Sequence, residues 1–354
     1  SNVPLQVSGL TGITAIAGGG AHSLALKNDG MVWAWGWNLY GQLGNGTNTN
    51  SNVPVQVSSL TGMTSIAAGT SHSLALKNDS TVWAWGYNFV GAIGNGTNTD
   101  SNFPVQVSSL TGITAIAGGG SHSLALKNDG TVWAWGSNYY GELGNGNNTD
   151  SNVPMQVSSL TGITVIAGGE DHSLALKNDG TVWAWGRNND GELGNGTNTG
   201  SNVPVQVSSL TGITTIAGGV FHSLALKNDG TVLAWGYNGY GELGNGNNTD
   251  SNIPVQVTGL CQVATSVNEV TELLSISVFP NPVQTQLKLN LAIPANEISI
   301  RVYDLQGKMI ALPTTFTSTQ AQLNTTTLPD GFYTLQITNN KTGECEVGKF
   351  VKQQ

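Results

Sequence analysis

Residues 113–146 read ITAIAGGGSHSLALKNDGTVWAWGSNYYGELGNG, and their pattern decides the fold. Two runs that alternate large and small side chains, 122–127 and 131–135, flank an Asn-Asp-Gly hairpin turn, and a short β-rich run precedes them. A fourth strand-like run follows at 153–157, where a proline indicates a sheet edge because it cannot donate a ladder hydrogen bond. The stretch therefore predicts a sheet of four short antiparallel strands.

This stretch belongs to a tandem repeat of 50 residues, and such four-stranded units cannot bury their faces alone. The repeat predicts an all-β fold, a β-propeller in which each sheet packs on the next, with a stacked solenoid as the alternative. The SNxPxQV strand occurs six times against five HSLALK hairpins, so we hypothesise that the chain is part of a longer propeller. The units span 1–50, 51–100, 101–150, 151–200 and 201–250, with a partial sixth at 251–260.

The composition changes after the repeats, since 44 of the 48 glycines and all ten tryptophans precede Cys261. We expect the propeller to cover 1–260, a linker to cover 261–274, and a small immunoglobulin-like β-sandwich to cover 275–354. Cys261 and Cys345 lack a CxxC spacing, so one disulfide or two free thiols are both compatible with the sequence.

Charge and hydropathy argue against nucleic-acid binding and against a membrane-spanning segment. The chain carries 21 acidic and 12 basic side chains, a formal charge of −9 and a pI near 4.8, so it lacks the basic surface that nucleic-acid binding requires. Apolar runs fall short of the ~18 residues of a membrane span. We expect neither a nucleic-acid partner nor a membrane-spanning segment.

Candidate catalytic and metal sites have simpler structural explanations. Five histidines share one repeat position and could form a metal ring, but a buried imidazole bonded to backbone suits the HSLALK strand better. The aspartate of each Asn-Asp turn is explained as a turn former. The Gly-Asn-Gly-Thr-Asn-Thr-Asp loops lack the spaced carboxylates of a calcium loop. The tryptophan at repeat position 35 suits packing between blades. Because the chain also lacks a nucleophile elbow, a P-loop and an HExxH motif, we expect no enzyme activity, no metal and no cofactor. The five histidines are His22, His72, His122, His172 and His222.

The repeats differ from one another mainly at positions 20–21, 37, 39 and 40, whereas HSLALKND is identical in all five units. In an antiparallel meander both variable segments lie at the same end of the blade, and they are rich in aromatic residues that give large, rigid contact areas. We interpret this end as a recognition surface, with neutral drift of exposed loops as the alternative. The predicted partner-binding residues are Trp37, Leu39, Tyr40, Tyr87, Phe89, Tyr139, Tyr140, Glu170, Asp171, Arg187, Asp190, Phe221, Tyr237 and Tyr240.

The repeat, with its GG..H..AL...G.V..WG.N..G.LG pattern, resembles that of the regulator of chromosome condensation family. The resemblance covers residues 1 to about 260 and implies a β-propeller of usually seven blades, from which the five units here depart. The blade number of the intact protein stays open.

The last 80 residues resemble the type A C-terminal sorting domain of the type IX secretion system. That resemblance implies a Gram-negative bacterial protein that is exported and then displayed at the outer-membrane surface or released, whether or not the domain is cleaved. Its signal peptide would lie outside the given sequence. The residues that carry the resemblance are Pro280, Asn281, Pro282, Tyr303, Asp304, Gly307, Lys308, Gly331, Tyr333 and Lys349.

Together these features predict a secreted or cell-surface binding scaffold. We expect its variable loops to bind a protein or a glycan and residues 275–354 to engage the secretion machinery. Two alternatives stay open: a secreted inhibitor of an enzyme, as in the β-lactamase inhibitory proteins built from similar repeats, and a regulator like the guanine-nucleotide exchange factor that founded the family.

Overall fold

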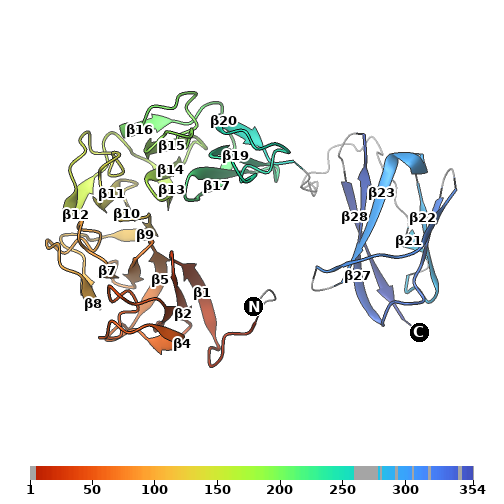
Figure 1. Ribbon diagram of the computed structural model, residues 1–354, viewed down its shortest axis with the longest axis horizontal. Coiled ribbons are helices and arrows are strands. Elements are labelled where there is room, and N and C mark those ends of the chain that lie inside the picture. The colour runs from red at the N-terminus through yellow and green to blue at the C-terminus, as the bar shows by residue number, and fades with distance from the viewer. Residues whose placement is uncertain are drawn as a thin grey trace. The chain divides into compact units, whose positions relative to one another are not determined.

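The computed structural model describes residues 5–258 and, in the C-terminal part, residues 278–353 apart from 280, 292–293, 305–306, 318–319 and 342–344 (Figure 1). The chain divides into two compact units, Ser1–Thr258 and Gly259–Gln354. Each unit is all-β. The expected linker at 261–274 and the question of a Cys261–Cys345 disulfide fall outside the described residues and side chains.

The first unit contains five four-stranded antiparallel sheets, each a meander in chain order. The first blade comprises β1 (Ile13–Gly18), β2 (His22–Lys27), β3 (Val32–Gly36) and β4 (Ser51–Gln56), and the second comprises β5 (Met63–Ala68), β6 (His72–Lys77), β7 (Val82–Gly86) and β8 (Ser101–Gln106). The third comprises β9 (Ile113–Gly118), β10 (His122–Lys127), β11 (Val132–Gly136) and β12 (Ser151–Gln156). The fourth comprises β13 (Ile163–Gly168), β14 (His172–Lys177), β15 (Val182–Gly186) and β16 (Ser201–Gln206), and the fifth comprises β17 (Ile213–Gly218), β18 (His222–Lys227), β19 (Val232–Gly236) and β20 (Ser251–Gln256).

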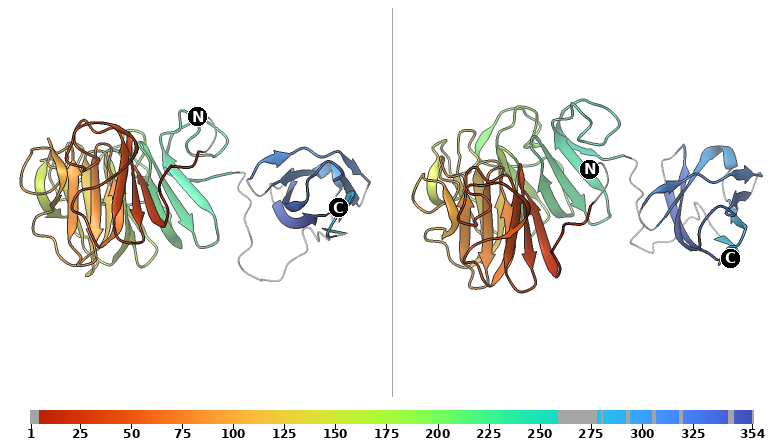
Figure 2. Two further views of the ribbon diagram at one scale, coloured as in Figure 1. Left: turned by 90° about the horizontal axis from the view of Figure 1, so that it is seen from below. Right: turned by 60° about the horizontal axis from the view of Figure 1, so that its bottom comes forward.

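These elements confirm the propeller fold and the four strands expected from residues 113–157. The strand with the proline is the outermost of each sheet, where its missing N–H faces no neighbouring strand. In each hairpin turn the aspartate acts as the expected turn former, for example Asp129, whose Oδ1 accepts the Thr131 N–H at 3.0 Å. Figures 1 and 2 show the blades arranged around a common axis that the first strand of each blade lines.

Successive blades pack face to face through apolar side chains. The second strand of each blade contacts the first strand of the next, as β10 does with β13. At this junction Leu124, Leu126 and Val132 of the third blade form one buried cluster with Ile166 and Trp185 of the fourth. Burial of this kind contributes roughly 25 cal/mol per Å² of apolar surface, and the same cluster recurs at each of the four junctions between blades.

A polar network inside each junction fixes how one blade meets the next. At the second junction Trp135 Nε1 and the Ser123 hydroxyl both donate to the Ala92 carbonyl of the preceding blade, each at 2.9 Å. His72 of that preceding blade lies 2.9 Å from Ser123 Oγ through Nε2. Since the single hydroxyl proton goes to the carbonyl, the imidazole is the donor in this contact. The network therefore links an imidazole, a hydroxyl, a carbonyl and an indole across two blades.

The two end blades of the arc expose the faces that the other blades bury. Ile16 in β1 is 79% exposed, whereas Ile66, Ile166 and Ile216 at the same repeat position are at most 8% exposed. Trp35 is half-buried, which corrects the expectation that every tryptophan at this position belongs to the core, because no described blade precedes it. At the other end Leu224 is half-buried where Leu24, Leu74, Leu124 and Leu174 are buried.

The second unit is a sandwich of two four-stranded sheets around a single apolar core. One sheet has the order β21 (Val278–Phe279), β22 (Gln286–Asn290), β26 (Gln320–Asn324), β25 (Thr314–Phe316), and the other has the order β24 (Met309–Ile310), β23 (Ile298–Tyr303), β27 (Gly331–Asn339), β28 (Cys345–Lys352), with a short 3-10 helix at Ala295–Glu297. Leu287, Leu335 and Phe350, which come from both sheets, are buried in the core. This confirms the expected β-sandwich.

The contrast between Ile16 and Ile166 gives a direct stability prediction. Ile166→Ser removes buried apolar surface and should lower the free energy of unfolding by about 3 kcal/mol, whereas Ile16→Ser should change it by less than about 0.5 kcal/mol. Urea unfolding of the full chain followed by tryptophan fluorescence measures both. Equal losses for the two variants would show that the face of the first blade is covered in solution.

Candidate functional site

The two variable segments of each blade meet at one end of the sheet. In the third blade His122 pairs with Gly136, and Gly136 pairs with Ser151, so the loop before His122 and the loop between Gly136 and Ser151 share one end. A backbone bond from the Ser137 N–H to the Ser121 carbonyl, 2.9 Å long, joins the two loops. We call this end the variable face: residues 19–21, 37–50 and their equivalents in every blade. The opposite end, with the Asn-Asp hairpin turns, is called the turn face.

A buried asparagine organises the long loop of the variable face. Asn138 is fully buried, and its Nδ2 donates to the carbonyls of Asn147 and Thr149, each at 3.0 Å. Its Oδ1 accepts the Leu143 N–H at 2.9 Å, so the amide is satisfied on both sides. The same contacts recur at Asn38, Asn88, Asn188 and Asn238, which makes the loop a uniform support for the variable residues. This asparagine is not among the residues predicted from the sequence, although its invariance within the repeat was a usable signal.

The predicted partner-binding residues all lie on the variable face, but they differ in exposure. The exposed members are Leu39, Phe89, Tyr139, Tyr140 and Tyr240, and the half-buried members are Trp37, Tyr40, Tyr87, Glu170, Asp171, Arg187, Asp190, Phe221 and Tyr237. Phe89, Tyr139 and Tyr240 are each more than 70% exposed. Large aromatic side chains that protrude from a rigid loop are typical of contact surfaces.

Aromatic contacts connect neighbouring blades on this face. The Tyr40 ring lies edge-on to Trp37 at 5.2 Å between centroids and to Tyr87 of the second blade at 5.0 Å. In the third blade Tyr139 and Tyr140 meet edge-on at 4.8 Å. These arrangements restrict the rings, so a partner that binds them loses little side-chain entropy.

A different cluster occupies the junction of the fourth and fifth blades. The Arg187 guanidinium donates to Asp190 at 2.7 Å and to the buried Glu192, and it lies over the Phe221 ring at 4.4 Å from the centroid. Two carboxylates and an aromatic face thus hold one arginine, through ion pairs and a cation–π contact. Arg187, Asp190 and Phe221 were predicted from the sequence as separate contact residues, whereas Glu192 was not predicted.

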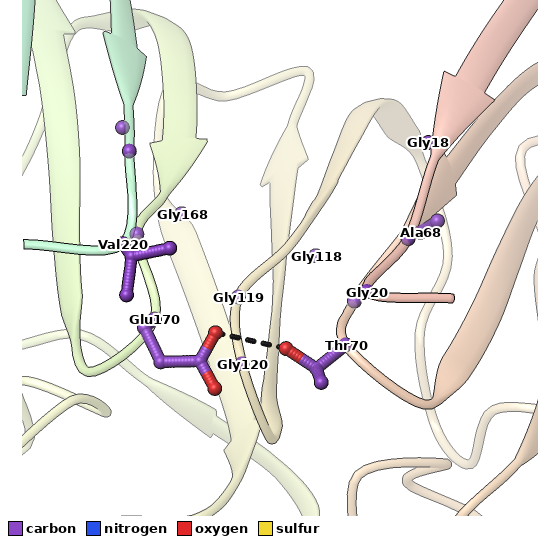
Figure 3. Close-up of a pocket in the computed structure, with 15 residues that line it drawn as sticks. Gly18, Gly20, Ala68, Thr70, Gly118, Gly119, Gly120, Gly168, Glu170 and Val220 are labelled. Carbon is purple, nitrogen blue, oxygen red and sulfur yellow. Dashed lines mark hydrogen bonds between the residues drawn. The ribbon is translucent and has the colours of Figure 1, made fainter. Parts of the chain in front are cut away.

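The axis of the unit contains a shallow hollow of about 260 Å³ lined mainly by glycines from all five blades (Figure 3). Glu170 accepts the Thr70 hydroxyl across it at 2.8 Å. Backbone bonds link neighbouring blades here, for example from the Thr70 N–H to the Gly120 carbonyl at 3.1 Å. A Cβ on Gly118 would lie 2.6 Å from the Ala68 carbonyl oxygen, so the close approach of the inner strands requires glycine. The hollow is therefore explained by packing.

The histidines are structural, though their partners differ from the expectation. In four blades Nε2 contacts a serine hydroxyl of the next blade, not a backbone group as the sequence suggested. Burial lowers the pKa of His72, His122 and His172 to about 3 and that of His22 to about 4, which keeps these imidazoles neutral. Ser123 is fully buried and donates to a carbonyl, so the His–Ser contact cannot serve as a nucleophile and base. Among the described residues, no three His, Cys, Asp or Glu side chains gather as metal ligands.

The charges of the propeller separate between its two ends. On the turn face each blade pairs one lysine with one aspartate, as Lys27 does with Asp29 at 2.8 Å, so the charges of that face cancel. Every other charged residue of the repeats lies on the variable face. These are Arg187 and the nine acids Asp100, Glu142, Asp150, Glu170, Asp171, Asp190, Glu192, Glu242 and Asp250. The variable face therefore carries the entire formal charge of −8 in the repeats.

The sorting-motif residues support the turns and edges of the sandwich. Asn281 precedes a cis proline, Pro282, and its Oδ1 accepts the Val351 N–H of β28 at 2.9 Å. Asp304 Oδ1 accepts the Lys308 N–H at 2.9 Å, in a turn that includes Gly307 at a φ of +77°. The Tyr303 hydroxyl donates to the Gln336 side chain. Gly331 begins β27 and Lys349 lies in β28. Pro280 falls outside the described residues. The Tyr333 hydroxyl donates to the Pro329 carbonyl at 2.8 Å, and its ring stacks on Phe350.

Comparison with known families agrees with this geometry. The profile of the RCC1-like domain matches residues 101–277, and profiles of the regulator of chromosome condensation (RCC1) repeat match 29–76 and, in a second version, 13–42 and 63–92. The chain belongs to the RCC1-like domain family. The secretion system C-terminal sorting domain matches residues 277–353 of this RCC1-like protein, which indicates export by type IX secretion to the cell surface or the extracellular space.

Solved structures show the same fold at low sequence identity. Human WBSCR16 is 22% identical with a TM-score of 0.66, and the match covers 91% of this chain and 89% of that one. Prp20p from Saccharomyces cerevisiae is 22% identical with a TM-score of 0.53, covering 75% of this chain and 79% of that one. The ultraviolet-B receptor UVR8 of Arabidopsis thaliana is 50% identical over 36 residues, which is 10% of this chain and 8% of the receptor.

In the described part of the RCC1-like protein, no helix is long and apolar enough to cross a membrane.

Glu142 gives the variable face a specific pH dependence. Burial raises the pKa of its carboxyl from 4.5 to about 7, so the unfolded chain ionises this group at lower pH than the folded chain does. Its contribution to stability is present below pH 4.5 and is lost as the pH rises to 7, by up to about 3 kcal/mol. We expect Glu142→Gln to gain stability relative to wild type across this interval. The histidines act in the opposite direction in both proteins and cancel from the difference.

Thermal unfolding of both proteins between pH 4.5 and 7.5 measures this effect. A stability difference between Glu142→Gln and wild type that stays constant over the interval would contradict it.

Proposed function

We propose that this protein is a secreted or surface-displayed binding scaffold whose variable face recognises a macromolecular partner. The observation that carries the proposal is the concentration of sequence variation at one face of a uniform framework. The asparagine network and the junction contacts are the same from blade to blade, while Phe89, Tyr139 and Asn189 occupy one equivalent position. A rigid support with diversified side chains at one end suits recognition.

The same contacts support a non-catalytic role. Seven of the nine acids of the variable face accept backbone or hydroxyl hydrogen bonds, as Asp150 does from the Asn138 N–H at 2.8 Å. Four of the five histidines are buried between blades and neutral, so they are out of reach of a substrate, whereas the fifth, His222, is half-buried at the end of the arc. Prp20p binds Gsp1p and histones, but the likeness of this chain to Prp20p lies below 25% identity and supports the fold alone. Exchange-factor activity therefore has no supporting contact here, and inhibition of a secreted enzyme is one form that recognition could take.

The sorting domain gives the cellular setting of the proposal. Residues 277–353 match a secretion sorting domain, and we infer a Gram-negative bacterium that displays or releases the propeller outside the cell. The domain forms a compact unit separate from the repeats, so it can engage the secretion machinery while the propeller stays folded.

The recognition surface can be tested by removing its most exposed rings. The triple variant Phe89→Ala, Tyr139→Ala, Tyr240→Ala should reduce recovery of a bound partner from extracts of surface and secreted proteins at least tenfold, because aromatic side chains dominate contact energies. Its melting temperature should stay within a few degrees of wild type, since these side chains are mostly exposed. Met155→Ala, on the outer strand β12, is the control and should bind as wild type does. Undiminished recovery by the triple variant would refute the proposed surface.

The sorting role can be tested by deletion. A chain that ends at residue 274 should fold its repeats, with a tryptophan fluorescence spectrum like that of the full chain, yet accumulate in the periplasm because it lacks the export domain. Cell fractionation and surface proteolysis measure its location. Normal display at the surface would contradict the assignment.

A further inference from the structure

Every blade carries an Asn-Gly pair in the long loop of the variable face. An asparagine followed by glycine is especially prone to deamidation, because the glycine nitrogen has no side chain beside it and can attack the asparagine amide. Residues 141–150 and 241–250 both read GELGNGNNTD, so the third and fifth blades offer two such pairs in the same local sequence. The asparagines of the five pairs are Asn45, Asn95, Asn145, Asn195 and Asn245.

In the first four blades the next blade holds the glycine of the pair. The Gly146 N–H donates to the Asn202 carbonyl of β16 at 2.9 Å, and Asn202 Nδ2 donates back to Asn148 Oδ1 at 2.8 Å. The glycine nitrogen must lose its proton before it attacks, and an N–H bonded to a carbonyl is protected against that loss. The equivalent donors Gly46, Gly96 and Gly196 lie 2.9, 2.8 and 2.8 Å from the carbonyl oxygens of Asn102, Asn152 and Asn252.

The fifth blade has the same loop without these contacts. Within the described part of the chain, no group accepts the Gly246 N–H and none donates to Asn248 Oδ1, because no described blade follows. The space is open as well. A Cβ on Gly241 would have no neighbour within 4 Å, whereas a Cβ on Gly141 would lie 2.5 Å from the Cα of Asn202. Position in the arc therefore distinguishes two loops of identical sequence.

We propose that Asn245 is a deamidation site and that the contacts between blades protect the corresponding asparagine in the first four blades. The Gly246 nitrogen gives its proton to hydroxide and attacks Cγ of Asn245, which closes a five-membered succinimide ring. The side-chain nitrogen takes up a proton from water and leaves as ammonia. A water molecule then opens the ring at either carbonyl and leaves aspartate or isoaspartate. The net reaction consumes one water and releases one ammonia.

The product changes the charge of the variable face at its fifth blade. Asn245 Oδ1 accepts the Asn247 N–H and Asn238 Nδ2, each at 3.3 Å. A carboxylate accepts both bonds, so the aspartate form keeps the loop, whereas isoaspartate lengthens the backbone by one carbon. The exposed ring of Tyr240 belongs to the same loop and gains a negative neighbour. The inference goes beyond the proposed function and holds whether or not a partner binds this face.

A sixth Asn-Gly pair, Asn238-Gly239, provides an internal control. Asn238 is fully buried, its Nδ2 donates to the carbonyls of Asn247 and Thr249, and its Oδ1 accepts the Leu243 N–H at 2.9 Å. Because both ends of this amide are bonded, its Cγ is held away from the following nitrogen. We expect Asn238 to stay unmodified while Asn245 reacts.

The test incubates the full chain at mildly alkaline pH and follows each Asn-Gly pair by mass spectrometry. Digestion with trypsin and a glutamate-specific protease places the six pairs in six separate peptides, since Glu242 lies between Asn238 and Asn245. Asn245 should deamidate at least about fivefold faster than Asn145, which is the factor that one backbone hydrogen bond supplies. Amide hydrogen exchange should likewise be faster at Gly246 than at Gly146.

The same incubation in guanidinium chloride is the control. Once the chain is unfolded, Asn145 and Asn245 should deamidate at rates within about twofold of each other, because their local sequences are identical. Equal rates at Asn145 and Asn245 in the folded chain would overturn the inference. An excess at Asn245 that persists in guanidinium chloride would also overturn it, because the difference would then not come from the contacts between blades.

Discussion

The contact on which the rest of the propeller depends is the carbonyl that receives two hydrogen bonds from the next blade. In each junction a tryptophan indole and a serine hydroxyl donate to the same backbone oxygen, as Trp185 and Ser173 do to Glu142 at 2.7 and 2.9 Å. A histidine of the preceding blade forms a further hydrogen bond with the serine hydroxyl, as His122 does with Ser173. Because this network lies inside an apolar cluster, an unpaired member would carry a desolvation penalty, and the blades are held in one relative position.

That constraint explains which positions of the repeat are invariant and which vary. Residues that enter the junction or the loop framework are identical from unit to unit, as His122, Ser123 and Asn138 illustrate. On the turn face the charges cancel blade by blade, and little varies. Variation, exposed rings and uncompensated charge are left to the variable face, which is where the framework imposes no side chain. The geometry of recognition is therefore set by conserved contacts within the repeat, while its chemistry is set by a few positions per blade.

Much of the fold followed from local sequence, because hairpin turns, alternation and a fixed period report directly on strands. The Asn-Asp-Gly turn at 128–130 and the proline of β12 both lie where the pattern placed them. Contacts between blades were harder to predict. The serine partner of each histidine lies 51 residues away in the chain, and a repeat pattern does not say which side chains of neighbouring units meet. The half-buried state of Trp35 likewise depends on its place at the end of the arc.

The location of the candidate site could be predicted from the sequence, but the burial and the separation of its charges could not. Positions 37, 39 and 40 could be recognised as variable from the sequence. The burial of the Glu142 and Glu192 carboxyl groups, and the raised pKa of Glu142, could not, because both depend on packing against the next blade. The separation of charge is present in the sequence, yet it becomes apparent only once the topology assigns each loop to a face. The sorting domain was recognised from its motifs, whose side chains hold the turns of the sandwich.

The most direct test of the account is hydrogen exchange of Trp135→Phe compared with wild type. The substitution removes one indole donor from the junction of the second and third blades and leaves the ring packing nearly intact. In a stacked array each unit contacts only its neighbours, so exchange should accelerate in residues 91–94 and in β10, while the junction of the fourth and fifth blades keeps its protection. Equal acceleration in all five blades, or no change at residues 91–94, would contradict the claim that this shared carbonyl holds neighbouring blades together.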